Sequence, residues 1–368
     1  MSTPRLEINL EKIMHNARAL TALFASKGVE ITAVTKGVCG SPEVAATLVR
    51  SGIYSLGDSR LANLQKMREA GIDAQFVLLR SPMPSEVEQV VKVADVSLTS
   101  EISIVRLLAK HAAMCGRNHG VILMIEMGDL REGILPADIE PIVQETIGLD
   151  GVKLVGIGTN LACFGGIRPT EAKMAELSRI ADNIQQRFKI KLQVVSGGNS
   201  ANYQWFVSTA DVGLVKHLRI GEAILLGCET LYQRPIPGLY TDAFTLVAEV
   251  IEVKTKPSEP YGERAQDAFG RVLLFKDRGC MRRAILAVGE QDIDASAITP
   301  RIEADVLGAS SDHLILDARD SGLKVGAEVQ FDIKYSTLLR AMTSPYVRKV
   351  FLRPSAGGLQ SGGQRPRP

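Results

Sequence analysis

The chain has 368 residues, a formal net charge of +2, and the hydrophobic and charged fractions (45% and 23%) of an ordinary globular protein. The near balance of acidic and basic side chains argues against a general nucleic-acid binder, which needs a basic surplus. The longest apolar stretches, such as 121–125, are far shorter than the roughly 20 residues of a membrane span. The N-terminus carries no charged-then-apolar leader, and the cysteines are scattered without metal or disulfide spacing. We therefore expect a cytoplasmic protein with reduced thiols and no metal site.

Short β-branched runs alternate with amphipathic stretches over the first two-thirds of the chain. The predicted strands are 30–35, 54–57, 75–79, 95–98, 121–126, 153–158, 193–196 and 217–220. Apolar residues at three- and four-residue spacing predict helices over 42–50, 60–70, 85–94, 101–114, 137–147 and 170–188. This alternation indicates parallel strands with crossover helices, and a closed (β/α)₈ barrel over 11–234 is the most economical fold. A doubly wound open sheet is the alternative, because periodicity does not reveal closure.

The pattern changes near Pro235. The strand-like runs beyond it are 243–252, 272–275, 283–288, 301–307, 313–317 and 327–333, with no long helical pattern. An all-β second domain is therefore predicted over 235–353. The strand-like segment 4–10, which precedes a predicted helix over 10–24, is expected to join this domain. The Gly-, Pro-, Ser- and Gln-rich end, 354–368, predicts a disordered tail.

Lys36 directly follows the first predicted barrel strand. The carboxyl ends of barrel strands form the mouth in which active sites of this fold lie. A lysine that is buried there has a depressed pKa and can form a Schiff base. A lysine that merely extends to solvent from a strand end would have no such role.

Two glycine-containing segments follow the seventh and eighth predicted strands, SGGNS at 196–200 and RIGEA at 219–223. Loops at these positions of a barrel commonly form a phosphate site. Glycines let backbone N–H groups approach phosphate oxygens, and Ser200 adds a hydroxyl donor. A Schiff-base lysine combined with a phosphate site indicates pyridoxal 5'-phosphate as cofactor.

These features resemble the alanine racemase superfamily of fold-type III pyridoxal-phosphate enzymes, and most closely its ornithine racemase-like branch. The segments that carry the resemblance also include 33–40, 57–60, 127–133, 156–161, 308–313 and Tyr335 in the expected terminal strand. The resemblance runs from about residue 4 to 353. It implies a barrel, a β domain and a homodimer whose active sites each lie between one barrel and the partner's β domain.

The resemblance assigns roles to individual residues. Lys36 matches the lysine that holds the cofactor and acts as the base on the D-face of the substrate. Asn199, Ser200 and the Gly221 backbone match the phosphate cradle. Tyr335 matches a tyrosine that hydrogen-bonds the phosphate.

Arg219 matches the arginine that faces the pyridine nitrogen. A guanidinium is always charged and only donates, so it leaves the ring nitrogen unprotonated and favours racemisation over transamination. Glu222 lies in the same matched segment and is expected among the cofactor-binding residues. Arg131 matches an arginine near the phenolic oxygen. Asn160 stands where the alanine-specific enzymes carry a histidine beneath the ring.

The base for the L-face is open between two residues. The resemblance implies a Tyr-Gly pair from the partner's β domain, and Tyr261 with Gly262 offers one. Counting back from Gly289, however, places Phe269 at the matching position, and phenylalanine cannot exchange a proton. Tyr261 and the nearby Asp267 are therefore both candidates.

The resemblance implies a racemase of a basic amino acid, ornithine or lysine. An alanine or serine racemase and a non-catalytic pyridoxal-phosphate carrier are the alternatives, and a carrier would lack the β domain. A related dehydratase or aldolase would need a metal site with His and Cys in that domain, where His313 and Cys280 are the only ones. A cationic side chain needs oxygen acceptors at its far end. Ser311 and the carboxylates Asp267, Glu290, Asp292 and Asp312 lie in segments that could supply them.

Overall fold

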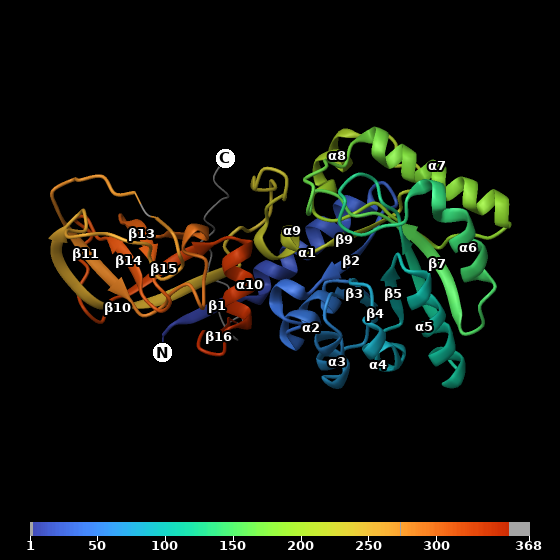
Figure 1. Ribbon diagram of the computed structural model, residues 1–368, viewed down its shortest axis with the longest axis horizontal. Coiled ribbons are helices and arrows are strands. Elements are labelled where there is room, and N and C mark those ends of the chain that lie inside the picture. Colours follow the sequence, from blue (N-terminus) through green and yellow to red (C-terminus); the bar gives the residue numbers. More distant parts are fainter. Residues whose placement is uncertain (1–2, 273, 353–368) are drawn as a thin grey trace, which may run out of the picture. The chain divides into compact units, whose positions relative to one another are not determined.

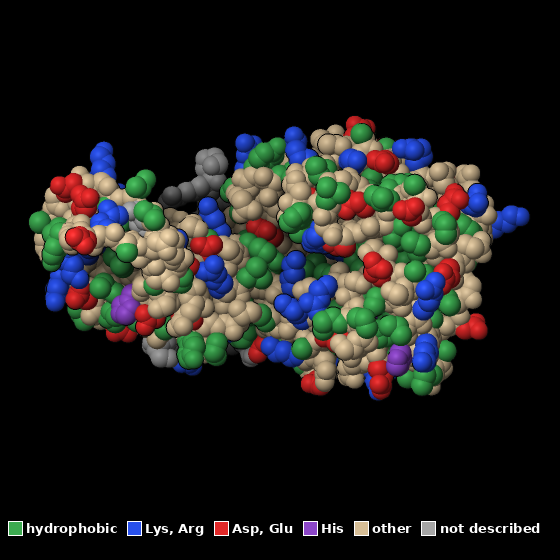
Figure 2. All heavy atoms as spheres, viewed as in Figure 1, with side chains coloured by type: hydrophobic (Ala, Val, Ile, Leu, Met, Phe, Trp, Pro, Cys, Tyr) green, Lys and Arg blue, Asp and Glu red, His purple; other side chains and the backbone are tan. Residues whose placement is uncertain are grey.

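The computed structural model describes residues 3–272 and 274–352, and the predicted tail lies outside these ranges. The described chain divides into two compact units, 11–241 and 3–10 with 242–352. The division therefore falls after Thr241, slightly beyond the predicted boundary at 234. Figure 2 shows acidic and basic side chains interspersed over the visible surface, in keeping with the net charge of +2.

Eight parallel strands close into a barrel in the larger unit (Figure 1). In barrel order they are β2 (Glu30–Val34), β3 (Ser55–Asp58), β4 (Gln75–Leu78), β5 (Val96–Thr99), β6 (His119–Met124), β7 (Val152–Gly158), β8 (Val194–Ser196) and β9 (His217–Ile220). β9 pairs in parallel with β2, with Arg219 opposite Thr32, and this pairing closes the ring. The predicted (β/α)₈ barrel is confirmed, and the open sheet is ruled out.

Helices precede, connect and follow the barrel strands. They are α1 (Leu10–Ala25), α2 (Pro42–Arg50), α3 (Leu61–Glu69), α4 (Val87–Val93), α5 (Ile102–Met114), α6 (Ile139–Ile147), α7 (Glu171–Phe188), α8 (Asn202–Ser208) and α9 (Glu222–Leu226), with 3₁₀ turns η1 (Lys36–Val38), η2 (Pro84–Glu86) and η3 (Pro136–Asp138). α2 starts where the sequence predicts because Ser41 caps it and Pro42 occupies its first turn. Its buried face, which includes Val44 and Leu48, packs inward.

An apolar cluster and a set of hydrogen-bonded polar side chains occupy different parts of the barrel wall. Val77, Val96, Leu98, Ile122 and Met124, from β4 to β6, form one buried cluster. By contrast, the neighbouring strands β8, β9, β2 and β3 carry hydroxyl and imidazole side chains that hydrogen-bond to one another. These four strands include β9 and β2, the pair that closes the barrel.

The second unit is a mainly antiparallel sheet with, among its described residues, one α-helix, and its β1–β16 pair is parallel. Its elements are β1 (Arg5–Asn9), β10 (Phe244–Pro257), β11 (Cys280–Leu286), η4 (Ala295–Ala297), β12 (Ile298–Pro300), β13 (Asp305–Ala309), β14 (Leu314–Asp317), β15 (Glu328–Ile333), α10 (Tyr335–Thr343) and β16 (Arg348–Leu352). The strand order is β12-β15-β10-β11-β14-β13, and β1 pairs with both β10 and β16. The N-terminal strand thus belongs to this unit.

Two expectations for this unit are wrong. Tyr335 begins helix α10 rather than lying in a strand, because Thr337, Leu338, Ala341 and Met342 form a buried face at helical spacing. The predicted strand at 272–275 does not form among its described residues, since Val272 and Leu274 are 72% and 95% exposed. Within the described ranges, no helix has the length and apolar character that a membrane crossing requires.

Candidate active site

Lys36 lies at the barrel mouth, as predicted, but its side chain is exposed rather than buried. β2 ends at Val34, and Lys36 begins the 3₁₀ turn η1, which takes the chain out of the barrel wall. The expected burial of Lys36 is therefore corrected, because the residue stands on the rim and not within the strand. The amine is accessible to a cofactor that enters the mouth.

Asp58 fixes the segment that carries Lys36. This fully buried carboxylate accepts hydrogen bonds from Thr35 Oγ1 at 2.7 Å, the Arg60 amide at 2.9 Å and Asn63 Nδ2 at 3.0 Å. Burial raises its pKa, and the three hydrogen bonds oppose that rise. The sequence analysis assigned Asp58 no role, because Thr35, which follows β2, and Asp58, which ends β3, are far apart in the sequence.

Arg219 is a buried cation whose acceptors are all uncharged. It donates to Ser196 Oγ, to the Thr159 carbonyl at 2.7 Å and to Asn160 Oδ1 at 3.3 Å. Burial lowers its pKa to about 10, so the guanidinium is still protonated at neutral pH. A buried cation whose hydrogen-bond partners are all uncharged favours an added hydrogen-bond acceptor, such as a ring nitrogen with a free lone pair.

The loops after β8 and β9 meet through Ser200, whose Oγ accepts the Ala223 amide at 3.2 Å. A Cβ at Gly198, where φ is +140°, would stand 2.3 Å from Asn202 Oδ1. A Cβ at Gly221 would stand 3.0 Å from Val34 Cβ. Glycine at both positions keeps the cradle compact, so backbone groups can approach an anion closely.

Asn199 and Asn160 join the loops after β7 and β8. Asn199 Nδ2 donates to Asn160 Oδ1 at 3.1 Å and to the Leu161 carbonyl at 2.9 Å, while its Oδ1 accepts the Ala201 amide at 2.8 Å. Asn160 Oδ1 therefore receives hydrogen bonds from both Asn199 and Arg219. The hydrogen bonds of these two side chains hold the loops after β7 and β8 together.

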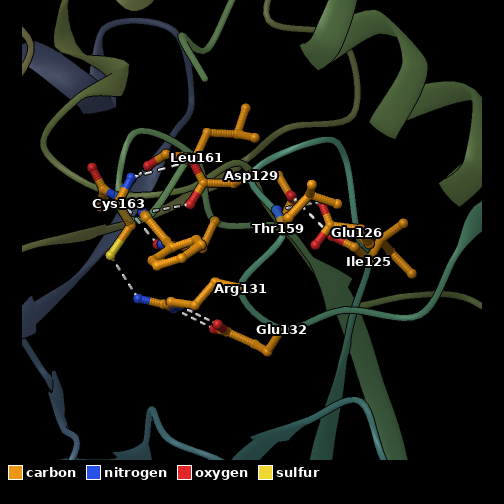
Figure 3. Close-up of polar contacts among 12 residues, drawn as sticks. Ile125, Glu126, Asp129, Arg131, Glu132, Thr159, Leu161 and Cys163 are labelled. Atoms are coloured by element: carbon orange, nitrogen blue, oxygen red, sulfur yellow. Dashed lines mark hydrogen bonds and ion pairs between the residues drawn. The ribbon is translucent and has the colours of Figure 1, made fainter. Parts of the chain in front are cut away.

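The loops after β6 and β7 are fixed by Asp129 (Figure 3). Its buried carboxylate accepts the amides of Cys163, Phe164 and Ile167 at 2.9–3.3 Å. These hydrogen bonds outweigh the effect of burial and lower its pKa. The sequence analysis assigned Asp129 no role, although it lies in a segment that carries the resemblance.

Arg131 emerges from the same loop and is held by Glu132, which pairs with Nε and Nη2, and by Cys163 Sγ, 2.7 Å from Nη1 (Figure 3). The Glu132 hydrogen bonds raise the pKa of Arg131. Glu222 starts α9 and is half-buried, and its Oε1 accepts Gln233 Nε2 at 3.0 Å. Burial raises the pKa of this carboxyl group.

The two candidate bases of the β unit differ in their surroundings. Tyr261 is 89% exposed in the segment between β10 and β11. Asp267 accepts the amides of Phe269 and Arg271 and the Arg271 Nε, and these contacts lower its pKa. Asp267 is therefore a weaker base than an ordinary aspartate, because its carboxylate already accepts hydrogen bonds within its own turn.

The other β-unit candidates lie in two neighbouring segments. Ser311 and Asp312 are exposed, and Asp312 Oδ1 lies 2.7 Å from His313 Nδ1. By contrast, Glu290 accepts Arg340 Nη1 at 2.7 Å, and the buried Asp292 accepts Ser344 Oγ at 2.5 Å. Glu290 and Asp292 thus hold α10, and Asp312 is the acidic side chain of this group that remains open to solvent. No cluster of described His, Cys, Asp and Glu side chains is arranged to hold a metal ion.

The barrel residues fit a phosphorylated aromatic aldehyde. Lys36 supplies an accessible amine that would bind the aldehyde carbon. Ser200 and Gly221 supply a glycine-lined cradle with a hydroxyl for the phosphate, and Arg219 supplies a buried cation for the ring nitrogen. These residues follow or lie on the adjoining strands β2, β8 and β9.

The sequence and the fold are similar to those of known racemases. The alanine racemase N-terminal domain family matches residues 8–228. A lysine racemase from Thermotoga maritima is 43% identical and an ornithine racemase from Acetoanaerobium sticklandii 38% identical, each over 95% of this chain and 99% of the relative. An alanine racemase structure from Streptomyces coelicolor superposes with a TM-score of 0.74 at 19% identity, over 95% of this chain and 98% of that one.

A barrel of this topology with a β unit, together with full-length similarity to racemases, defines an amino-acid racemase. The chain belongs to the alanine racemase family. The family and the enzyme class predicted from the sequence are both confirmed.

Proposed function

We propose that the protein is a pyridoxal-phosphate-dependent racemase of basic amino acids, with lysine and ornithine as its substrates. One observation carries the proposal, namely the identity of 43% and 38% to a lysine and an ornithine racemase over 99% of each relative. The site agrees with it, because Asn160 stands where the sequence pattern of alanine-specific enzymes has a histidine, and residues 37–40 after Lys36 lack the tyrosine that those enzymes carry there.

When bound, pyridoxal phosphate supplies an electron sink that stabilises negative charge at the substrate Cα. Lys36 would hold the cofactor through Nζ and then accept or return a proton at Cα from one face. Ser200 and the Gly221 backbone would bind the phosphate, and Arg219 would donate a hydrogen bond to the ring nitrogen without releasing its proton. Arg131 would face the cofactor's phenolic oxygen.

The second face needs its own proton donor. Tyr261 fits this role better than Asp267, because Asp267 is a stabilised anion within its own turn whereas Tyr261 extends into solvent. We place Tyr261 at the partner's site in a homodimer, with Tyr335 contributing to the phosphate contact. Ser311 and Asp312 are the exposed groups that would receive the substrate's distal ammonium.

The test is a panel of single enantiomers incubated with the holoenzyme in D₂O. Chiral chromatography would measure racemisation, and mass spectrometry would measure deuterium at Cα. We expect kcat/KM to be highest for lysine and ornithine, with alanine and serine at least tenfold lower. A preference for alanine would overturn the substrate proposal, and cofactor binding without deuterium exchange would overturn catalysis itself.

A further inference from the structure

A continuous set of hydrogen bonds runs from Arg219 into the barrel wall. Arg219 Nη1 donates to Ser196 Oγ, and Ser196 Oγ lies 2.9 Å from His217 Nδ1. His217 Nε2 lies 2.8 Å from Thr32 Oγ1, which in turn lies 2.7 Å from Ser55 Oγ. The catalytic proposal uses Arg219 and leaves the other four residues without a role.

The four partners come from adjacent strands at the closure of the barrel. Ser196 ends β8 and is paired in register with His217 on β9, while Thr32 and Ser55 lie on β2 and β3. His217 and Arg219 are two residues apart on β9, so their side chains lie on the same face of that strand. His217 therefore lies one layer deeper in the barrel than the guanidinium.

The numbers of donors and acceptors along this path give its hydrogen bonds a single direction, which leads away from Arg219. Arg219 can only donate, so Ser196 Oγ accepts from it. Burial lowers the pKa of His217 to about 3, so its imidazole is neutral with one N–H. If Nε2 carries that hydrogen, Ser196 donates to Nδ1 and His217 donates to Thr32, and each hydroxyl on the path both accepts and donates. In the opposite tautomer Nη1 and Nδ1 would both donate to the Ser196 oxygen, and its hydroxyl hydrogen would have no acceptor on this path.

We propose that His217 is a positioning residue for Arg219, acting through the Ser196 hydroxyl. His217 Nδ1 accepts a hydrogen bond from the Ser196 hydroxyl, so the lone pairs of the Ser196 oxygen point toward Arg219 Nη1. With Nη1 and Nη2 anchored by Ser196 and Thr159, the guanidinium plane is fixed, and its remaining N–H groups keep one direction. This inference rests on the proposed function in one respect, which is that the cofactor's ring nitrogen accepts a hydrogen bond from those N–H groups.

The barrel contains a matched control for this pair. His119 Nε2 lies 2.8 Å from Ser97 Oγ, and both side chains are buried on the neighbouring strands β6 and β5. Burial lowers the pKa of His119 to about 4, so this imidazole is also neutral. The hydrogen bonds of His119 and Ser97 do not lead to Arg219, so a substitution here reports only the structural cost of losing a barrel histidine.

The experiment compares His217→Phe with His119→Phe as holoenzymes. We expect His217→Phe to lower kcat by roughly ten- to hundredfold and to raise the transamination side reaction, because the guanidinium loses its fixed orientation. The ¹⁵N resonance of ring-labelled cofactor should shift in His217→Phe and stay unchanged in His119→Phe. His217→Asn, which can accept from Ser196 through its side-chain oxygen, should recover part of the loss. Equal kinetics, product partition and ¹⁵N shift in the two Phe variants would overturn the proposal.

Two further measurements keep the inference testable if His217→Phe does not fold. Thr32→Val removes the acceptor of Nε2 without touching Arg219, and it should give a smaller change of the same kind. In the unsubstituted apoprotein, ¹⁵N spectra should show His217 as the Nε2–H tautomer, and the Nδ1–H tautomer would contradict the path. If the substrate proposal fails because alanine is preferred, the ring ¹⁵N comparison still decides the role of His217, since it needs no substrate.

Discussion

In the barrel unit, the buried Arg219 is held by three hydrogen bonds to the ends of other strands, and the buried Asp58 joins Thr35 to the turn that follows β3. In the segment between β10 and β11 of the other unit, Tyr261 is 89% exposed, and Asp267 is bonded within its own turn. The comparison teaches that one chain by itself positions the residues proposed to hold the cofactor. The residues proposed to protonate the other face are either exposed, as Tyr261 is, or bonded only within their own turn, as Asp267 is.

Loss of Lys36 tests the barrel half and has the largest expected effect. Lys36→Ala should lower racemisation by more than about 10⁴-fold in both directions, because the covalent attachment and one base are lost together. Borohydride reduction followed by peptide mapping should label Lys36 in the unsubstituted enzyme and no residue in the variant. A label on another lysine would contradict the assignment.

Tyr261→Phe tests the exposed half. We expect racemisation to fall by roughly 10²- to 10⁴-fold while the cofactor spectrum is retained, because only the proton donor for one face is removed. Asp267→Asn is the matched control and should stay within about tenfold. Mixing Lys36→Ala and Tyr261→Phe protomers should restore activity, since a hybrid dimer has one intact site. An active Tyr261→Phe enzyme would transfer the role to Asp267.

Gly198→Ala tests whether the cradle is as compact as it appears in the barrel. The new Cβ would stand 2.3 Å from Asn202 Oδ1, which itself accepts the Asn199 amide. We expect the cofactor Kd to rise about tenfold or more, which corresponds to ~1.4 kcal/mol. Gly71→Ala, at φ +73° with no atom within 4 Å of its Cβ, carries the backbone strain alone and should leave the Kd unchanged.

A smaller effect concerns the pH dependence of barrel stability. His119 is neutral in the fold down to a pKa of about 4, against 6.5 when unfolded, so the unfolded chain binds its proton first. Stability from this group is complete above pH 6.5 and is lost as the pH falls toward 4. The shift corresponds to ~3 kcal/mol. Urea unfolding of the apoprotein at several pH values should show a shallower acid loss in His119→Gln, and an unchanged slope would contradict the neutral, buried imidazole.

The sequence predicts those parts of the molecule that depend on local patterns. The eight barrel strands follow from β-branched runs between amphipathic helices. Lys36 and Ser200 became candidates from their places after those strands, and Arg219 became one through the family resemblance. Asp58, Ser196 and His217 were not assigned roles, because their hydrogen bonds join strands that are distant in sequence. Helix α10 was missed because it opens with Tyr335 and Ser336, which are not strong helix formers.

The pairing of β9 with β2 brings the last strand of the barrel beside the first. During synthesis, Lys36 leaves the ribosome long before Arg219, so the two ends of the proposed cofactor site come together only after the eighth barrel strand has been made. A chain cut before β9 would retain Lys36 but would lack Arg219 and the closing edge of the barrel. Circular permutants offer the converse case, because new termini placed between β5 and β6 would keep β8, β9 and β2 contiguous in space. Such a permutant should assemble the proposed cofactor site once β8, β9 and β2 have all been made.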